Sequence, residues 1–331
     1  MKDYLVGDIR EPYKYVEKMC RGGLSDFPPL IITCAITGGL HGAESNPNLP
    51  EDLKAQAQSA YDAYNAGASM IHIHRRDPNN LAVMTSKSED FLEANALIRA
   101  KCPDVIINDT CVGGRFLNEY DQTMSDQWMT SVSAKPELAS FDITNFVHDL
   151  QIGPRKPPLP NPAEGRRRPL YYMMTPSDAV NAVKIMAEHD VKPEFEIFDP
   201  ADVKYMKLLI KKNLVKPPYW CSALFNGIGT WPSPEMVMAM VNSLPPESLL
   251  SIIGVGACQF PMVGLGIIMG HHIRVGMEDN VYYAPGELAK SNAQMVERAV
   301  RLAHELGRKI ATPAQAREMI GISATPRPYK I

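Results

Sequence analysis

The sequence carries no excess of charge of either sign and no long hydrophobic run. It has 34 Lys and Arg residues against 37 Asp and Glu residues, a net charge of −3 over 331 residues, and this balance lacks the basic surface that nucleic acids require. No stretch of ~18 apolar residues runs uninterrupted by charges or turn formers, as a membrane-spanning helix requires. We therefore expect neither a nucleic-acid partner nor a membrane partner.

The sequence also lacks closely spaced cysteines. Its six cysteines form no C-x-x-C pair, which argues against a structural zinc knuckle and against a disulfide framework. Several stand in apolar runs such as "IITCAI", where a small buried thiol is common. The polar start of the chain has no apolar core of a secretory signal. These features together indicate a cytoplasmic protein.

What the sequence does contain is a regular alternation of short β-rich runs with amphipathic helical runs. We expect eight strands, at residues 29–37, 69–77, 104–110, 137–144, 193–199, 219–226, 249–256 and 272–279. Strands separated by helices pair in parallel, and over ~250 residues the usual closed form is a (β/α)8 TIM barrel, an α/β fold of one domain. A doubly wound open sheet is the alternative. In "GVGACQ", however, Gln259 stands where a dinucleotide-binding fingerprint needs its third glycine.

Composition divides the chain into three segments. We expect a polar N-terminal extension at 1–27, a barrel catalytic domain at 28–322 and a short C-terminal tail at 323–331. Within the barrel domain, "GPRKPPLPNPAEGRRRP" has no apolar period. Its prolines and charges predict a surface loop inserted at about 152–169.

Two histidines stand at the end of the expected second strand. His72 and His74 lie on one face of it, ~6.5 Å apart along the chain, and two imidazoles at this spacing can bind one zinc ion. In a closed barrel the second and last strands both flank the first. Glu278 or a neighbouring acid can therefore complete a set of two histidines and one carboxylate with an open position for substrate. The alternative is that His72 and His74 are hydrogen-bonded core residues.

Longer stretches of the sequence resemble the β-keto acid cleavage enzymes, whose founding activity is 3-keto-5-aminohexanoate cleavage in lysine fermentation. They are "LIITCAITGG", an E-x-N-P-x-L-P motif, "AGASMIHIHRRD", "GHHIRVGMEDN" and "KSNAQMVERAVRLAHELGR", in order from about residue 28 to 320. The resemblance implies a zinc-dependent barrel that forms a homotetramer. It also implies a reaction in which a β-keto acid and acetyl-CoA give acetoacetate and a new acyl-CoA.

The resemblance further implies roles for individual residues. The zinc ligands are His72, His74 and Glu278; the base is Asp279, held together with the reacting groups by Arg274 and Glu196. The substrate pocket is lined by Glu44, Thr110 and Ser140, the last two matched by their hydroxyl groups only. A free Asp, with a pKa of ~3.9, is a weak base, so Asp279 needs burial or a like-charged neighbour. Glu196 would raise its pKa, and Arg274 would lower it.

The charge of the substrate can also be argued from the sequence. If Glu44 and Asp109 both line the distal end of the pocket, their charges favour a cationic tail, as in 3-keto-5-aminohexanoate or dehydrocarnitine. For the basic run Arg166 to Arg168, a solvated surface is the simpler interpretation. Contact with the phosphates of coenzyme A is the alternative.

Three other functions were weighed against this one. A metal-dependent hydrolase of the amidohydrolase type carries H-x-H on its first strand and lone histidines on middle strands. Here a complete strand precedes the pair, and between residues 75 and 270 only His148 and His189 occur, in apparent loop and helix. A zinc-barrel hydroxyacyl-CoA lyase is a closer alternative. A non-enzymatic binding barrel would have lost the acids and histidines at its strand ends, and this chain has kept them.

Overall fold

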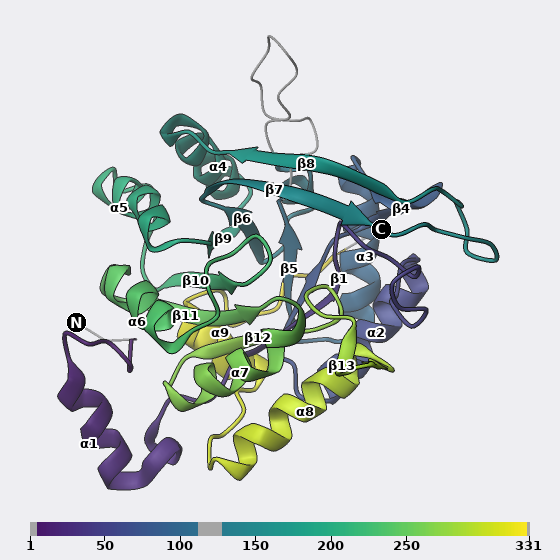
Figure 1. The fold of residues 1–331 in the computed structure, drawn as a ribbon. Coiled ribbons are helices and arrows are strands. Elements are labelled where there is room, and N and C mark those ends of the chain that lie inside the picture. Colours follow the sequence, from purple (N-terminus) through teal and green to yellow (C-terminus); the bar gives the residue numbers. More distant parts are fainter. Residues whose placement is uncertain (1–4, 112–127, 330–331) are drawn as a thin grey trace.

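A closed barrel of eight parallel strands lies at the centre of the computed structural model, which describes residues 5–111 and 128–329 (Figure 1). Around the barrel the strands are β1 (Ile32–Thr37), β12 (His272–Val275), β11 (Ser248–Gly254), β10 (Tyr219–Phe225), β9 (Lys192–Ile197), β6 (Leu138–Asp142), β5 (Ile106–Thr110) and β2 (Met70–Ile73). Each expected strand overlaps one of them, so the predicted TIM barrel is confirmed. The open-sheet alternative is wrong, because β1 pairs with both β2 and β12 and closes the sheet.

The barrel strands are buried on both faces. Every residue of β1, β10 and β11 is buried, as expected for a parallel sheet covered by helices. The N-terminal end of the barrel is filled by an apolar cluster that includes Ile31, Met70, Ile106, Leu138, Trp220 and Leu249. Polar side chains lie instead at the opposite end of the barrel, where the strands finish.

Helices surround the barrel, and several begin with a hydrogen-bonded cap. They are α1 (Pro12–Gly22), α2 (Leu53–Asn65), α3 (Ser88–Lys101), α4 (Pro176–Glu188), α5 (Val203–Lys211), α6 (Pro234–Ser243), α7 (Gln259–Ile268), α8 (Asn292–Glu305) and α9 (Pro313–Ile320). The Thr175 and Asp178 side chains each accept a hydrogen bond from the other's backbone N–H, which fixes the start of α4. In the described part of the chain, no helix is long and apolar enough to cross a membrane.

Short elements complete the structure. The 3-10 helices are η1 (Gly23–Asp26), η2 (Thr130–Ala134), η3 (Pro200–Asp202) and η4 (Gly256–Cys258), and the small strand pairs are β3 (Arg76–Asp77) with β4 (Asn80–Met84) and β13 (Tyr282–Ala284) with β14 (Glu287–Leu288). Part of the N-terminal extension is buried, contrary to its expected polar character. Leu5 and Val6 are 1% and 2% exposed, before α1 begins at Pro12.

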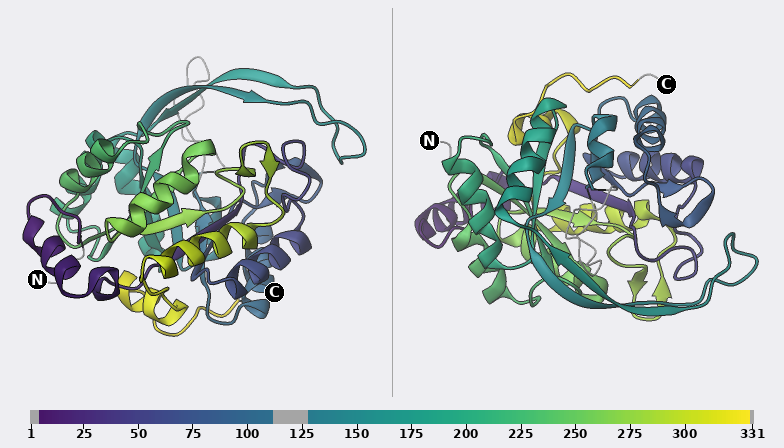
Figure 2. Two further views of the ribbon diagram at one scale, coloured as in Figure 1. Left: turned by 60° about the horizontal axis from the view of Figure 1, so that its bottom comes forward. Right: turned by 90° about the horizontal axis from the view of Figure 1, so that it is seen from above.

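The segment expected to be an irregular loop is in part a strand of a long β-hairpin. β7 (Asn145–Ile152) and β8 (Arg166–Met173) pair antiparallel, and the hairpin arches out across the molecule (Figure 2). The prediction of loop at about 152–169 is therefore wrong for residues 166–169, which belong to β8. A basic run can form a strand here because one face of the hairpin meets solvent, where Arg167 pairs with Asp149, Nε to Oδ2 2.6 Å.

Candidate metal centre and active site

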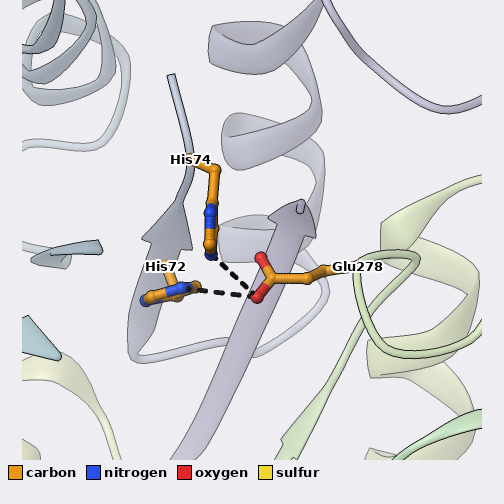
Figure 3. A group of neighbouring side chains, drawn as sticks. All are labelled: His72, His74 and Glu278. Carbon is orange, nitrogen blue, oxygen red and sulfur yellow. Dashed lines mark ion pairs between the residues drawn. The ribbon is translucent and has the colours of Figure 1, made fainter. Parts of the chain in front are cut away.

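Two histidines and one glutamate meet at the C-terminal end of the barrel. His72 belongs to β2, His74 follows that strand and Glu278 follows β12; both strands flank β1. The Nε2 atoms of His72 and His74 lie 3.5 Å and 3.1 Å from Oε1 of Glu278 (Figure 3). One ligand atom from each residue lies within 4.8 Å of the other two. Two imidazoles and one carboxylate are a ligand set of catalytic zinc sites, which keep a further position open.

The surroundings of these side chains also fit a metal. His72 is 1% exposed, and in the described structure neither of its ring nitrogens has a hydrogen-bond partner. Glu278 Oε2 is likewise buried without one. Burial lowers the pKa of His74 against the pull of Glu278, which favours the neutral imidazole that binds metals. Unpartnered buried polar atoms are costly, so the interpretation of His72 as a hydrogen-bonded core residue does not fit.

Two glycines allow Glu278 to reach this position. Gly276 directly follows β12 with φ of 139°, and a Cβ there would lie 2.1 Å from the Ala35 carbonyl oxygen. A Cβ on Gly38, in the loop after β1, would lie 2.8 Å from Cγ of Glu278. Both positions therefore require glycine. The turn and the close approach together hold the carboxylate beside the histidines.

Arg274 joins three carboxylates in the same site. Its Nε and Nη2 atoms donate to the two carboxylate oxygens of Asp279 at 2.9 Å each, and Nη1 donates to Glu196 at 3.2 Å. Nη2 also donates to Glu278. Burial alone would raise the pKa of Glu278, but Arg274 and the two histidines hold it well below its usual range. Glu278 is therefore ionised, as a metal ligand must be.

The surroundings of Asp279 raise its pKa and so make it a stronger base than a free Asp. Burial raises its pKa, Arg274 opposes this, and the nearby Glu278 charge adds to the rise, with a net shift upward. The sequence left open whether Arg274 lowers the pKa of Asp279 more than an acidic neighbour raises it. In the structure burial is the largest cause, and the acid that contributes is Glu278 rather than Glu196.

A second acid, Asp142, belongs to the site although the sequence argument gave it no role. It ends β6 and lies against Glu196 of β9, and both side chains are buried. Burial and the Asp142 charge raise the pKa of Glu196 well above its usual range, so the pair holds a proton between its two carboxyl groups. The signal for Asp142 was its place as the last residue of a strand, on the same face as Ser140.

Four residues predicted to line the substrate pocket lie elsewhere than expected. Thr110 and Ser140 are paired in register on β5 and β6, buried in the barrel below the cavity lining. Asp109 faces the opposite way, toward α3, where Asn95 donates to it at 2.8 Å and burial raises its pKa well above the usual range. Glu44 accepts from Arg155 at 3.0 Å outside that lining. The prediction of a cationic tail thus loses the support of Asp109, while Glu44 lines an adjoining cavity and is paired there with Arg155.

The group of His72, His74 and Glu278 opens into a cavity of about 600 Å³ under the hairpin. At one end it is lined by His74, Asp142, Glu196, Arg274, Glu278 and Asp279. The remaining lining is mainly apolar and aromatic and includes Phe146, Leu150, Leu170, Tyr172, Phe198 and Leu224. A cavity with a few convergent polar groups in an apolar wall is typical of a small-molecule site.

Comparisons with known proteins agree in fold and family. The β-keto acid cleavage enzyme family model matches residues 29–322. The chain is 36% identical over 298 residues to the 3-keto-5-aminohexanoate cleavage enzyme of Acetoanaerobium sticklandii, covering 89% of this chain and 98% of that protein. It is 29% identical over 306 residues to the 3,5-dioxohexanoate:acetyl-CoA acetone transferase of Paraburkholderia graminis, covering 88% and 95%. The apo structure of ObcA shares the fold, with a TM-score of 0.61 at 19% identity over 83% of this chain and 66% of that one.

Proposed function

The chain belongs to the β-keto acid cleavage enzyme family and is an acetyl-CoA-using enzyme, and from that premise we propose a zinc-dependent reaction in which a β-keto acid and acetyl-CoA give acetoacetate and a new acyl-CoA. The observation that carries the proposal is the single cavity in which His74 and Glu278 adjoin Arg274 and Asp279, with His72 completing the ligand set. The hydrolase and lyase alternatives need no acetyl donor, so their products distinguish them from the proposed reaction.

Zinc held by His72, His74 and Glu278 would polarise the ketone of the β-keto acid and stabilise the negative charge that develops on its oxygen. The protein's own part is the movement of one proton. Asp279 accepts it from C2, the carbon between the ketone and the carboxylate of the β-keto acid. Arg274 fixes the orientation of Asp279 through both carboxylate oxygens, which holds Asp279 beside the proposed zinc ligands.

The rest of the reaction follows from atom balance. C2 forms a bond to the acetyl carbonyl carbon, the bond between C2 and C3 breaks, and the thioester sulfur passes to C3. The proton taken by Asp279 returns to C2 in acetoacetate. No covalent bond to the enzyme is required, in keeping with the buried thiols of Cys34, Cys111 and Cys221, whose pKa values burial raises.

The phosphates of coenzyme A fit the outer end of the cavity. Arg166 lines both this cavity and an adjoining one toward the hairpin tip, and a guanidinium there can contact phosphate oxygens. We also propose the homotetramer that the resemblance implies. Large apolar side chains that remain exposed on one chain, Tyr13 at 84% and Trp231 at 81%, support association.

The test is a matched pair of histidine variants. In His72→Ala we expect the zinc content of the purified protein to fall and acetoacetate formation from acetyl-CoA and β-keto acids to drop by at least about a hundredfold. His304→Ala changes an exposed residue of α8 and should keep both. Full zinc and full activity in His72→Ala would contradict the proposal.

A further inference from the structure

The hairpin supplies one wall of the cavity through a single face. Phe146, His148 and Leu150 alternate with exposed residues along β7 and line the cavity, while Val147, on the outer face, is 72% exposed. Phe146 stacks on Tyr172 of β8, with ring centroids 5.3 Å apart, and on Phe198, which follows β9, at 5.5 Å. The hairpin is thus joined to the barrel rim by a continuous aromatic stack.

The barrel residues that adjoin this face of the hairpin are also apolar. Phe198, Leu224 and Ile253 form a buried cluster, with Phe146 and Ile228 packed against it. Phe198, Leu224 and Ile228 line the cavity at the ends of β9 and β10. This end of the cavity is continuous with the polar end that holds Arg274 and Glu278.

The acidic side chains of the cavity lie together at its polar end. Asp279, Glu278 and Glu196 bond to Arg274, and Asp142 lies beside Glu196 on the neighbouring strand. Of the hairpin residues that line the cavity, Arg166 carries a permanent positive charge. Along β8 it lies roughly 20 Å from Tyr172 at ~3.4 Å per residue, out of reach of a tail of a few carbons seated beside that ring.

Glu44, the acid expected to attract a cation, is held by the hairpin itself. Arg155, in the hairpin tip, donates to Glu44 at 3.0 Å and to both carboxylate oxygens of Glu51 at 2.7 Å each. All three side chains are at least nine-tenths buried. The tip is thereby anchored on the far side of the mouth, and the Glu44 carboxylate is paired with a cation.

We propose that the β-keto acid of this enzyme carries an uncharged apolar tail, seated against the continuous apolar surface that Phe146 and Leu170 of the hairpin form with Phe198, Leu224 and Ile228 of the barrel. The inference rests on the proposed function and names its substrate class. An alkyl or aryl tail gains free energy from burial against this surface. An ammonium or carboxylate tail would lose its water there without gaining a counter-charge.

The test uses three β-keto acids of matched length whose tails end in an alkyl group, an ammonium group or a carboxylate group. With the zinc-loaded enzyme and acetyl-CoA, we expect kcat/KM for the alkyl tail to exceed both others by at least about tenfold. Leu170→Glu places a carboxylate on the inner face and should move the preference toward the ammonium tail by about tenfold or more. Val147→Glu adds the same charge on the outer face of the hairpin and should leave the preference unchanged.

The outcomes separate this inference from the proposed function. A wild-type preference for either charged tail overturns the inference and leaves the acetyl-CoA reaction standing. If none of the three acids yields acetoacetate with zinc bound, the proposed function falls and the inference with it. Ile228→Glu repeats the test from the barrel wall should Leu170→Glu not fold. If the inner-face variants change only the KM for acetyl-CoA, equally for every acid, the apolar wall holds the pantetheine arm instead of the tail.

Discussion

At the scale of single residues, Arg274 organises the site. It holds Asp279 through two hydrogen bonds and reaches Glu196 and Glu278 from the same guanidinium. A planar fork of donors suits this task, because it fixes the direction of a carboxylate as well as its charge. Asp279, the proposed base, therefore cannot rotate away from His72, His74 and Glu278 without breaking both bonds.

Replacing the base tests this arrangement. We expect Asp279→Asn to lower kcat by about 10²- to 10⁴-fold, the usual contribution of a positioned general base, because the amide cannot accept a proton from C2. The zinc content should remain that of the wild type, since Asp279 is not a ligand in the proposed site. An equal kcat in the variant, with metal retained, would remove Asp279 from the reaction.

The sequence located much of the site because parallel strands deliver their ends to one place. His72 and Arg274 lie on the two strands that flank β1, and His74 and Glu278 follow those strands. Asp109 was misplaced because side chains alternate between faces: its neighbour Asn108 points into the barrel and donates to Glu194, so Asp109 points out.

At the scale of elements, the hairpin β7–β8 turns an open barrel mouth into a walled cavity. Sequence reading missed it because "TNFVHDLQI" is short and its partner begins with three arginines. The alternation of Phe146, His148 and Leu150 was the available signal. The anchoring of the tip could not be foreseen, because Arg155 finds Glu44 and Glu51 more than 100 residues away in the chain.

The anchor gives a stability prediction with a pH dependence. Arg155→Ala leaves Glu44 and Glu51 without their cation and should lower the free energy of unfolding by about 3 kcal/mol at neutral pH. Although burial raises the pKa of Glu51, its bonds to Arg155 and Ala43 hold the pKa below the usual range. The stabilisation is therefore complete above the unfolded pKa of ~4.3 and disappears as the pH falls through the folded value.

The measurement is thermal unfolding of wild type and Arg155→Ala between pH 7 and pH 3. The difference in Tm should shrink below about pH 4. Arg167→Ala, on the same hairpin, breaks the exposed pair with Asp149 and should change Tm little. A Tm difference for Arg155→Ala that stays constant to pH 3 would contradict the ionic anchor.

Arg166 gives a second prediction for the hairpin. If it contacts coenzyme A phosphates, Arg166→Glu should raise the KM for acetyl-CoA about tenfold, the loss of one charge-assisted hydrogen bond, with little change in KM for the β-keto acid. Acetyl-pantetheine, which lacks the nucleotide phosphates, should show no difference between variant and wild type. An equal loss with both thioesters would place Arg166 away from the phosphates.

At the scale of the whole molecule, the two ends of the barrel differ. An apolar cluster fills the N-terminal end, and the candidate site lies at the C-terminal end. The apolar cluster at the N-terminal end makes the fold stable without constraining the opposite end. The positions of the strands and helices followed from hydrophobic periodicity, and the closed barrel was predicted from their alternation over ~250 residues. Association between chains leaves no such periodic pattern, and the tetramer was implied by resemblance alone.

The proposed homotetramer predicts the molecular mass of the protein in solution. Sedimentation velocity or light scattering at micromolar concentration should give about four times the 36.7 kDa of one chain. Trp231→Asp would test whether the exposed indole belongs to the contact, in which case the mass should fall. A wild-type mass of one chain would contradict the tetramer and leave the chemistry of the cavity untouched.

The most direct test of the central claim follows the acetyl carbons. The enzyme, loaded with zinc, is given acetyl-CoA labelled with ¹³C in both acetyl carbons and an unlabelled β-keto acid, and the products are analysed by mass spectrometry. We predict acetoacetate that carries both labels, together with an unlabelled acyl-CoA that begins at C3 of the β-keto acid. Label in the new acyl-CoA, or cleavage of the β-keto acid that proceeds without acetyl-CoA, would contradict the account.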